Sequence, residues 1–117
     1  MAGKNDDLEL KQLGQFYGSE KYHNVLGANV TDGVHYIMQN GYSWFVTDFL
    51  ISARMKPKLK KQEFLSALLV LKDKKAEMVV TDGNNNVLYT QKYEYTDAKK
   101  ELQLFFVGNV LMLENEY

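Results

Sequence analysis

The sequence predicts an α+β domain, with N-terminal helices packed on one face of a four- to five-stranded antiparallel sheet. Two observations predict this class. Apolar residues recur at helical spacing between Thr31 and Ala53, whereas the apolar period shifts towards two from Phe64 onward. The chain of 117 residues fits a single domain over 1–117, and its apolar share of 45% is typical of a protein with its own core.

The stretch from Thr31 to Ala53 predicts two helices separated by a glycine. Thr31 suits a helix N-cap, because its hydroxyl accepts a hydrogen bond from a free backbone N–H in the first turn. Gly41 suits the end of the first helix, because glycine adopts a positive φ without a steric penalty. The second helix has a wide apolar stripe that includes Trp44 and Ile51, so most of it is expected to be buried. Truncation of a buried Trp44 to alanine is expected to cost about 3–5 kcal/mol.

The segments that flank these helices carry weaker patterns. Asp6 suits the cap of a further N-terminal helix, and residues 19–30 predict a loop or a short strand at 22–26. Residues 54–62 predict a basic connector around Pro57, the only proline, which cannot continue a helix.

The remainder of the chain predicts strands joined by short turns. The expected strands cover residues 64–71, 76–81, 87–95, 102–107 and 110–114. Residues 83–86 (GNNN) predict a turn, because Gly and Asn tolerate positive φ. Gly108 stands first in the two-residue loop Gly108-Asn109, which predicts a type II′ hairpin.

Alternation in the last hairpin assigns its side chains to two faces. The expected core face carries Leu102, Leu104, Phe106, Leu111 and Leu113. The opposite face stays apolar near the turn, and its candidate partner-binding residues are Phe105, Val107, Val110 and Met112. Either the N-terminal helix covers this face, or the face binds a partner. The partner is then another protein or a second copy in a symmetric homodimer.

Tyrosine is abundant in this chain, with eight residues. Tyr89, Tyr93 and Tyr95 share one face of a predicted strand and are further candidates for partner binding, because tyrosine is enriched at interaction hot spots. Tyrosine is equally favourable in strands that helices cover, so both interpretations stay open.

Composition argues against several classes of function. Without cysteine, the chain has no disulfides, thiolate catalysis or Cys-based zinc sites. The net charge of −1, with both signs interspersed, argues against a dedicated nucleic-acid surface. No signal peptide, membrane span, phosphate-binding loop or nucleophile motif is visible. We therefore expect a cytoplasmic protein that needs no cofactor or metal. The two TDG motifs, at 31–33 and 81–83, suggest a metal-binding carboxylate pair, but a helix cap and a turn explain them more simply.

Two sets of polar residues carry alternative functions. His23, His35 and Asp48 are candidates for a small-ligand or hydrolytic pocket, because imidazole acts as a base or ligand near neutral pH. A basic run is a candidate for contacts with nucleic-acid phosphates, and its residues are Lys56, Lys58, Lys60 and Lys61.

Short segments spread over nearly the whole chain resemble, in matching order, a bacterial domain family of unknown function. They are LGQFYGSEKYH (13–23), TDGVHYIMQNGYSWFVTDFLIS (31–52), TDG (81–83), YEYTD (93–97) and LMLENEY (111–117). The resemblance implies a fold-level grouping and a bacterial, plasmid or phage setting, and it implies no activity.

The combined features favour a small non-enzymatic protein-binding module of bacterial or phage origin. The setting that the resemblance implies adds a narrower hypothesis, an anti-defence inhibitor of the anti-CRISPR type that occupies a protein partner.

Overall fold

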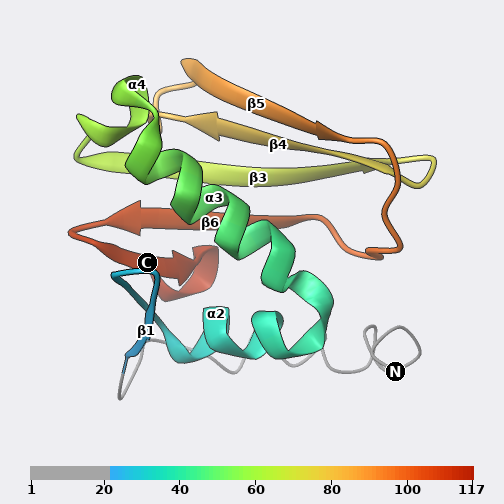
Figure 1. Cartoon of the computed structure of the whole chain (residues 1–117), viewed down its shortest axis with the longest axis horizontal. Helices are drawn as coiled ribbons and strands as arrows, with labels where there is room; N and C mark the ends of the chain where they lie inside the picture. Colours follow the sequence, from blue (N-terminus) through green and yellow to red (C-terminus); the bar gives the residue numbers. More distant parts are fainter. Residues whose placement is uncertain (1–21) are drawn as a thin grey trace.

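The computed structural model describes residues 22–117, which form one seven-stranded sheet and a set of helices (Figure 1). The strands are β1 (His23–Val25), β2 (Ala28–Val30), β3 (Phe64–Lys72), β4 (Lys75–Thr81), β5 (Val87–Tyr93), β6 (Leu102–Val107) and β7 (Val110–Leu113). Their order across the sheet is β1-β2-β7-β6-β3-β4-β5, and β2 and β7 are parallel while all other neighbours are antiparallel. The α+β class is confirmed, but the expected antiparallel sheet of four to five strands is wrong.

The two additional strands, β1 and β2, form a hairpin that joins the far end of the sheet. They span three residues each and are connected by Leu26 and Gly27, which both have positive φ. Runs this short are too brief to show an alternating pattern, which is why the sequence predicted only a loop or a strand at 22–26. β2 is held beside β7 because the Asn29 N–H donates to the Asn109 carbonyl at 2.9 Å.

A helical segment of 24 residues with an internal kink follows β2, and its last part crosses the sheet (Figure 1). Its parts are α2 (Asp32–Ile37), a π-helical segment (Met38–Tyr42) and α3 (Ser43–Met55). The segment bends at Asn40 and Gly41, where Gly41 has a φ of 101°. The predicted break at Gly41 is present as a kink, because Asn40 and Gly41 have non-helical backbone angles, although the 24 residues form one helical segment instead of two separate helices.

Both ends of this helical segment are set by local chemistry. The Oγ1 of Thr31 accepts a hydrogen bond from the Val34 N–H at 3.3 Å, so the predicted N-cap is confirmed. After α3, a single helical turn, α4 (Pro57–Lys60), replaces part of the expected connector. Pro57 begins this turn, since the first helical position needs no N–H donor and proline already has a helical φ.

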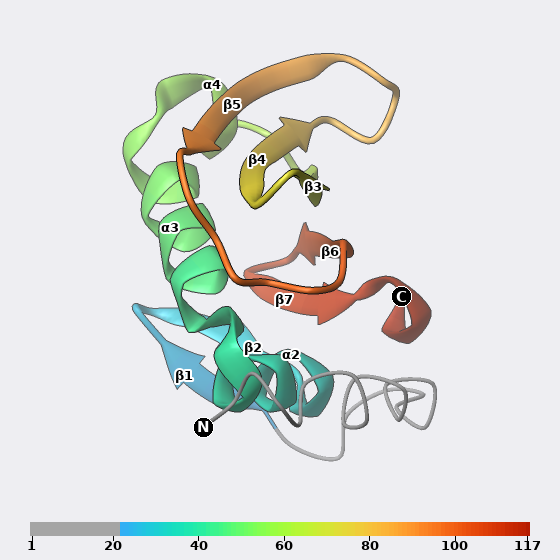
Figure 2. The ribbon, with the colours of Figure 1, turned by 90° about the vertical axis from the view of Figure 1, so that its right-hand side faces the viewer.

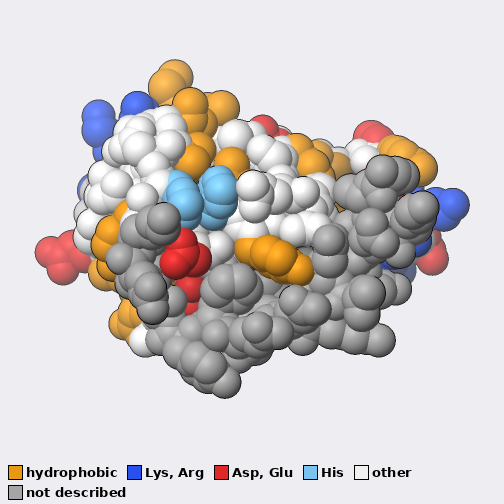
Figure 3. Space-filling model, turned by 90° about the horizontal axis from the view of Figure 1, so that it is seen from below, with side chains coloured by type: hydrophobic (Ala, Val, Ile, Leu, Met, Phe, Trp, Pro, Cys, Tyr) orange, Lys and Arg blue, Asp and Glu red, His pale blue; other side chains and the backbone are white. Residues whose placement is uncertain are grey.

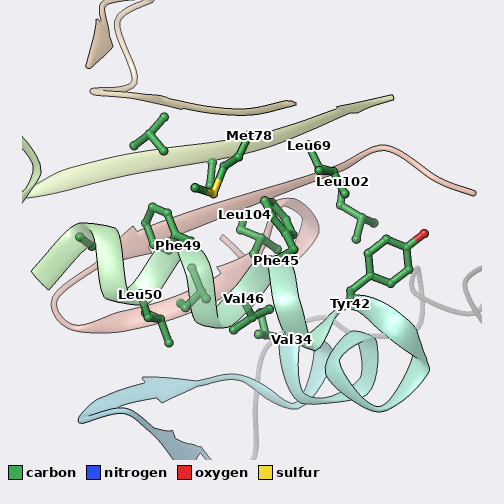
Figure 4. Close-up of a cluster of buried hydrophobic side chains, with 14 of the residues drawn as sticks. Val34, Tyr42, Phe45, Val46, Phe49, Leu50, Leu69, Met78, Leu102 and Leu104 are labelled. Atoms are coloured by element: carbon green, nitrogen blue, oxygen red, sulfur yellow. The ribbon is translucent and has the colours of Figure 1, made fainter. Parts of the chain in front are cut away.

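The core lies on the concave side of the curved sheet, against α3 (Figure 2). Figure 4 shows side chains from α3, β3, β4 and β6 meeting there. The largest fully buried residues include Tyr42, Phe45, Phe49, Leu69, Met78, Leu104 and Leu111. Full burial of each such side chain contributes about 1.5–3 kcal/mol. The expected core face of the last hairpin is confirmed, since Leu102, Leu104, Leu111 and Leu113 are buried and Phe106 packs against them.

Two apolar residues of α3 lie outside the core, contrary to the prediction. Ile51 is 51% exposed, and Trp44 is only partly buried. The sheet covers one side of the helix, and Phe45, Phe49 and Ser52 share that side because they are four and three residues apart. Ser52 is therefore buried although it is polar, and Ile51 points away although it is apolar.

The turn between β6 and β7 is of type I′, so the predicted type II′ is wrong. Gly108 and Asn109 both have positive φ, of 60° and 62°. Type II′ needs positive φ only at its first central residue, whereas type I′ needs it at both, and asparagine tolerates this conformation.

The helix predicted from Asp6 lies outside the described residues. Within residues 22–117, no helix has the length and apolar character that crossing a bilayer requires.

Candidate functional site

The convex side of the sheet carries the predicted partner-binding residues. The three α-helices all contribute buried side chains to the concave side, so the described chain places no α-helix over the convex one (Figure 2). Phe105 pairs with Met112, and Val107 pairs with Val110, so these four residues lie together opposite the core. All four are partly exposed.

Two further aromatic residues join this surface. The ring centroid of Phe105 lies 5.3 Å from that of Phe64 and 5.2 Å from that of Tyr117. Phe64 and Tyr117 are themselves 5.6 Å apart, so the three rings form a closed cluster. We call the surface made of Phe64, Phe105, Val107, Val110, Met112 and Tyr117 the open face. Phe64 and Tyr117 were not predicted to belong to this surface, because the strand pairing that places Phe64 beside Val107 leaves no local pattern in the sequence.

Phe64, a member of the open face, packs on the backbone of the turn between β4 and β5. A Cβ at Gly83 would lie 2.8 Å from the Phe64 ring, so the ring rests directly against the glycine backbone. Gly83 also has a φ of 88°, which favours glycine. Beside it, the Ser66 and Thr81 hydroxyls share a hydrogen bond of 2.7 Å between β3 and β4. The Phe64 ring therefore packs against the backbone at Gly83 as well as against the rings of Phe105 and Tyr117.

The three predicted partner-binding tyrosines do not form one surface. Tyr89 pairs with Val80 and Tyr93 pairs with Ala76, and these partners are buried on the concave side. Both tyrosines therefore pack against the core beneath α3. Tyr95 lies beyond the end of β5 and is 69% exposed. Tyr89 and Tyr93 thus lie on the helix-covered side of the sheet, and a role of the three tyrosines in partner binding stays a prediction.

Tyr93 is linked to α3 through Asp48. The Tyr93 hydroxyl donates to Asp48 Oδ2 at 2.8 Å, and the Gln91 amide donates to the same oxygen at 3.4 Å. Burial, followed by the hydrogen bond and the charge of Asp48, raises the pKa of Tyr93 well above its usual range. Asp48 thus orients a strand residue.

The two histidines meet, but not with Asp48 as the predicted pocket required. The rings of His23 and His35 are stacked with centroids 3.9 Å apart, and His23 Nε2 lies 2.9 Å from Asp32 Oδ1. Figure 3 shows the two histidine side chains side by side at the surface. This cluster joins β1 to the start of α2. A carboxylate-oriented imidazole is a component of general-base sites, but among residues 22–117 no group of three or more His, Cys, Asp or Glu is placed to hold a metal ion.

Both TDG motifs have structural roles. Thr31 caps α2, and its hydroxyl also donates to Glu116 Oε1 at 2.5 Å. In the second motif, Asp82 accepts hydrogen bonds from the Asn86 side chain at 2.9 Å and the Asn84 N–H at 2.8 Å, and these bonds lower its pKa. The interpretation as a helix cap and a turn is confirmed.

The basic run is divided between two environments. Lys56 Nζ lies 5.1 Å from the centroid of the Tyr89 ring, in a cation–π contact. Lys58, Lys60 and Lys61 are exposed on and after α4. Binding of nucleic acid by these lysines stays a prediction.

Comparison with known proteins assigns the chain to a family. A family model described as a family of unknown function (DUF6876) matches residues 7–117. Neither a curated protein nor a solved structure was found to match.

Proposed function

We propose, from the premise that the chain belongs to the family of unknown function DUF6876, that it is a non-enzymatic module that binds a protein partner through the open face. The observation that carries this proposal is the cluster of three aromatic rings, Phe64, Phe105 and Tyr117, at the surface of the sheet. Among these three residues, Tyr117 has the most exposed side chain, with 71% of its surface accessible. Contiguous apolar surface of this kind marks interaction sites in soluble proteins.

The chemistry of the open face favours a protein over other partners. Its six members are apolar or aromatic and none carries a charge. Aromatic residues and methionine are enriched at the centres of protein interfaces, where charged residues are depleted. Nucleic acid requires positive charge along its phosphates, which these residues do not supply. The partner that fits is a folded protein with an exposed apolar patch.

The contacts among the aromatic rings of the face support the same function. The Phe64 ring is seated on the Gly83 backbone, and each aromatic ring contacts the other two. Rings already held in place lose little side-chain freedom on binding, so more of the contact energy appears as affinity.

A narrower form of the proposal concerns the identity of the partner. The bacterial and phage setting that the resemblance implies motivates an inhibitor of a host defence protein, of the anti-CRISPR type, that acts in the cytoplasm. Support for this form consists of that setting alone.

Capture from a bacterial lysate tests the proposal, with the full chain as bait at moderate and high salt. Phe105→Asp and Val110→Asp are the test variants, because each places a charge on the open face. Ile51→Asp is the matched control, because Ile51 is an exposed apolar residue on α3, away from the sheet. We expect the wild type and the Ile51 variant to retain a stoichiometric protein at high salt, and both test variants to lose it.

The unfolding midpoint of each variant decides what a loss means. An unchanged midpoint with lost capture assigns the face to the interface. A large fall in the unfolding midpoint of Phe105→Asp shows that other parts of the chain cover this face. Retained capture of the partner by the two test variants shows that the partner binds elsewhere. Either of these two results ends the proposal. A captured nucleic acid that dissociates at high salt would favour the four lysines at 56–61 instead. A doubled mass in solution that Phe105→Asp halves would identify a homodimer.

A further inference from the structure

A second surface feature lies at the other side of the sheet, where the chain leaves β5. A cavity of about 350 Å³ is lined by Trp44, Tyr93, Tyr95, Thr96 and Asp97. Figure 1 shows the segment after β5 passing the beginning of α3 on its way to β6. The volume lies within the range of roughly 300–1,000 Å³ that is typical of small-ligand pockets.

Three of the five lining residues are aromatic, and two of them are fixed at a steep angle. The rings of Trp44 and Tyr93 have centroids 4.9 Å apart and planes inclined at 71°. The indole Nε1–H of Trp44 donates to the Gly41 carbonyl at 2.8 Å, and the Tyr93 hydroxyl donates to Asp48 at 2.8 Å. Both rings are therefore held from behind, and both polar groups have partners outside the cavity.

The third wall belongs to a loop that is also held in place. Thr96 is buried, its N–H donates to the Lys74 carbonyl at 2.8 Å, and its hydroxyl accepts from the Ala98 N–H at 3.0 Å. Tyr95 and Asp97 flank this anchored residue and are both exposed. The cavity thus has aromatic walls and one carboxylate at its edge.

From this arrangement we infer that the cavity binds an alkylated ammonium cation. The faces of Trp and Tyr rings attract cations, and quaternary ammonium groups are recognised by cages of such rings. A primary ammonium would need several hydrogen-bond acceptors, whereas the lining offers chiefly rings and one carboxylate. An alkylated ammonium needs few or no acceptors and spreads its charge over methyl groups.

Neighbouring charges bear on the strength of this binding. Asp97 attracts a cation at the edge of the cavity, and Asp48 lies behind Tyr93. An adjoining cavity, which shares Tyr95, Thr96 and Asp97, is lined by lysines that act against it, namely Lys72, Lys74, Lys75 and Lys99. We therefore expect a dissociation constant in the millimolar range and a clear dependence on Asp97.

Titration of the full chain with tetramethylammonium chloride tests the inference, at an ionic strength kept constant with sodium chloride. Trp44 is the only tryptophan, so its fluorescence reports on the cavity directly. Saturation transfer to the methyl protons of the cation provides a second measurement that does not depend on fluorescence. Choline and its uncharged isostere 3,3-dimethylbutan-1-ol separate attraction of charge from apolar contact. We expect saturable binding of both cations and none of the alcohol.

Three variants locate the site. Tyr95→Ala and Asp97→Asn change exposed residues and are each expected to weaken binding about two- to fivefold. Tyr22→Ala is the matched control, because Tyr22 is an exposed tyrosine that does not line the cavity. The affinity of this variant for the cation should equal that of the wild type. Equal binding of choline and the alcohol would overturn the inference. So would an unchanged affinity in Tyr95→Ala, or the absence of saturation by both measurements.

A peptide arm identifies the source of the cation. A short peptide that carries trimethyllysine is compared with the same peptide carrying lysine and with free tetramethylammonium. Tighter binding of the trimethylated peptide than of the free ion assigns the cavity to a modified protein, and equal binding assigns it to a small metabolite. Because the cavity and the open face share no residue, loss of one activity leaves the other measurable.

Discussion

At the scale of single residues, Tyr42 shows how one buried hydroxyl holds two distant segments together. Its side chain is fully buried, and its oxygen accepts from the N–H groups of Lys99 and Lys100 at 3.3 and 3.1 Å. We predict that Tyr42→Phe lowers the free energy of unfolding by about 1 kcal/mol, because two partly buried backbone N–H groups lose a hydrogen-bond partner. Urea denaturation measures this, with the exposed Tyr22→Phe as control. Equal midpoints in the two variants would contradict the prediction.

Trp44 and its neighbour Phe45 differ in what they stabilise. Phe45 is fully buried, so Phe45→Ala is expected to cost about 3–5 kcal/mol. Trp44 is partly exposed and packs on Tyr93 at the edge of the core, so Trp44→Ala should cost clearly less than that amount. Urea unfolding followed by circular dichroism compares the two variants. A larger loss for Trp44→Ala would place the tryptophan back in the core.

Tyr93 gives stability a dependence on alkaline pH. Its pKa is raised in the folded state, chiefly by burial, whereas an unfolded tyrosine ionises near about pH 10. Above that pH the unfolded chain releases a proton that the folded chain retains, so the free energy of unfolding falls as pH rises. We predict a steeper fall above about pH 10 for the wild type than for Tyr93→Phe. Parallel curves from urea titrations would refute this assignment.

At the scale of elements, two turn glycines allow the conformational cost of a substitution to be compared with its steric cost. Gly108 has a φ of 60° and open space around it, so Gly108→Ala should cost only the left-handed conformation, about 1–2 kcal/mol. Gly83 adds a contact of 2.8 Å with the Phe64 ring, so Gly83→Ala should cost more and should also displace that ring. Unfolding midpoints test the order, and capture of the partner should weaken only for Gly83→Ala.

Sequence patterns predicted the elements that carry their own periodicity. The strand β5 and the face of Leu104 and Leu111 follow from alternation, because burial on one side selects apolar residues at every second position. β3 is a continuous apolar run, which suits a buried helix equally well, and the turn that follows it favoured a strand. β1 and β2 are too short to show alternation. Their place in the sheet depends on pairing with β7, and such distant pairing leaves no local trace.

The candidate surfaces were predicted only in part for the same reason. Phe105, Val107, Val110 and Met112 could be found because they alternate within one hairpin. Phe64 and Tyr117 join them across strands, and Trp44 meets Tyr93 across the helix–sheet interface. An aromatic strand residue lies in the core or at the surface according to which face of the sheet the helices cover. A single sequence does not reveal which face that is.

At the scale of the whole molecule, we predict an uneven pattern of stability. β3 has β4 and β6 as neighbours and lies under α3, whereas β1 and β5 are the edges of the sheet. Amide hydrogen exchange should therefore be slowest in β3 and fastest in β1 and at the start of β5, because opening an edge strand disrupts fewer contacts. Uniform protection would mean that the sheet opens as one cooperative unit.

The parallel pairing of β2 with β7 has a consequence for synthesis on the ribosome. The Thr31 N–H donates to the Leu111 carbonyl at 3.1 Å, and the Glu116 carboxylate accepts from Thr31 and Gly33 at the start of α2. Residues made early thus find their partners some eighty positions later. Until those positions are translated, β1, β2 and the cap of α2 lack the strand and carboxylate that hold them. The β1–β2 hairpin therefore cannot take its place in the sheet until residues 110–116 have been synthesised.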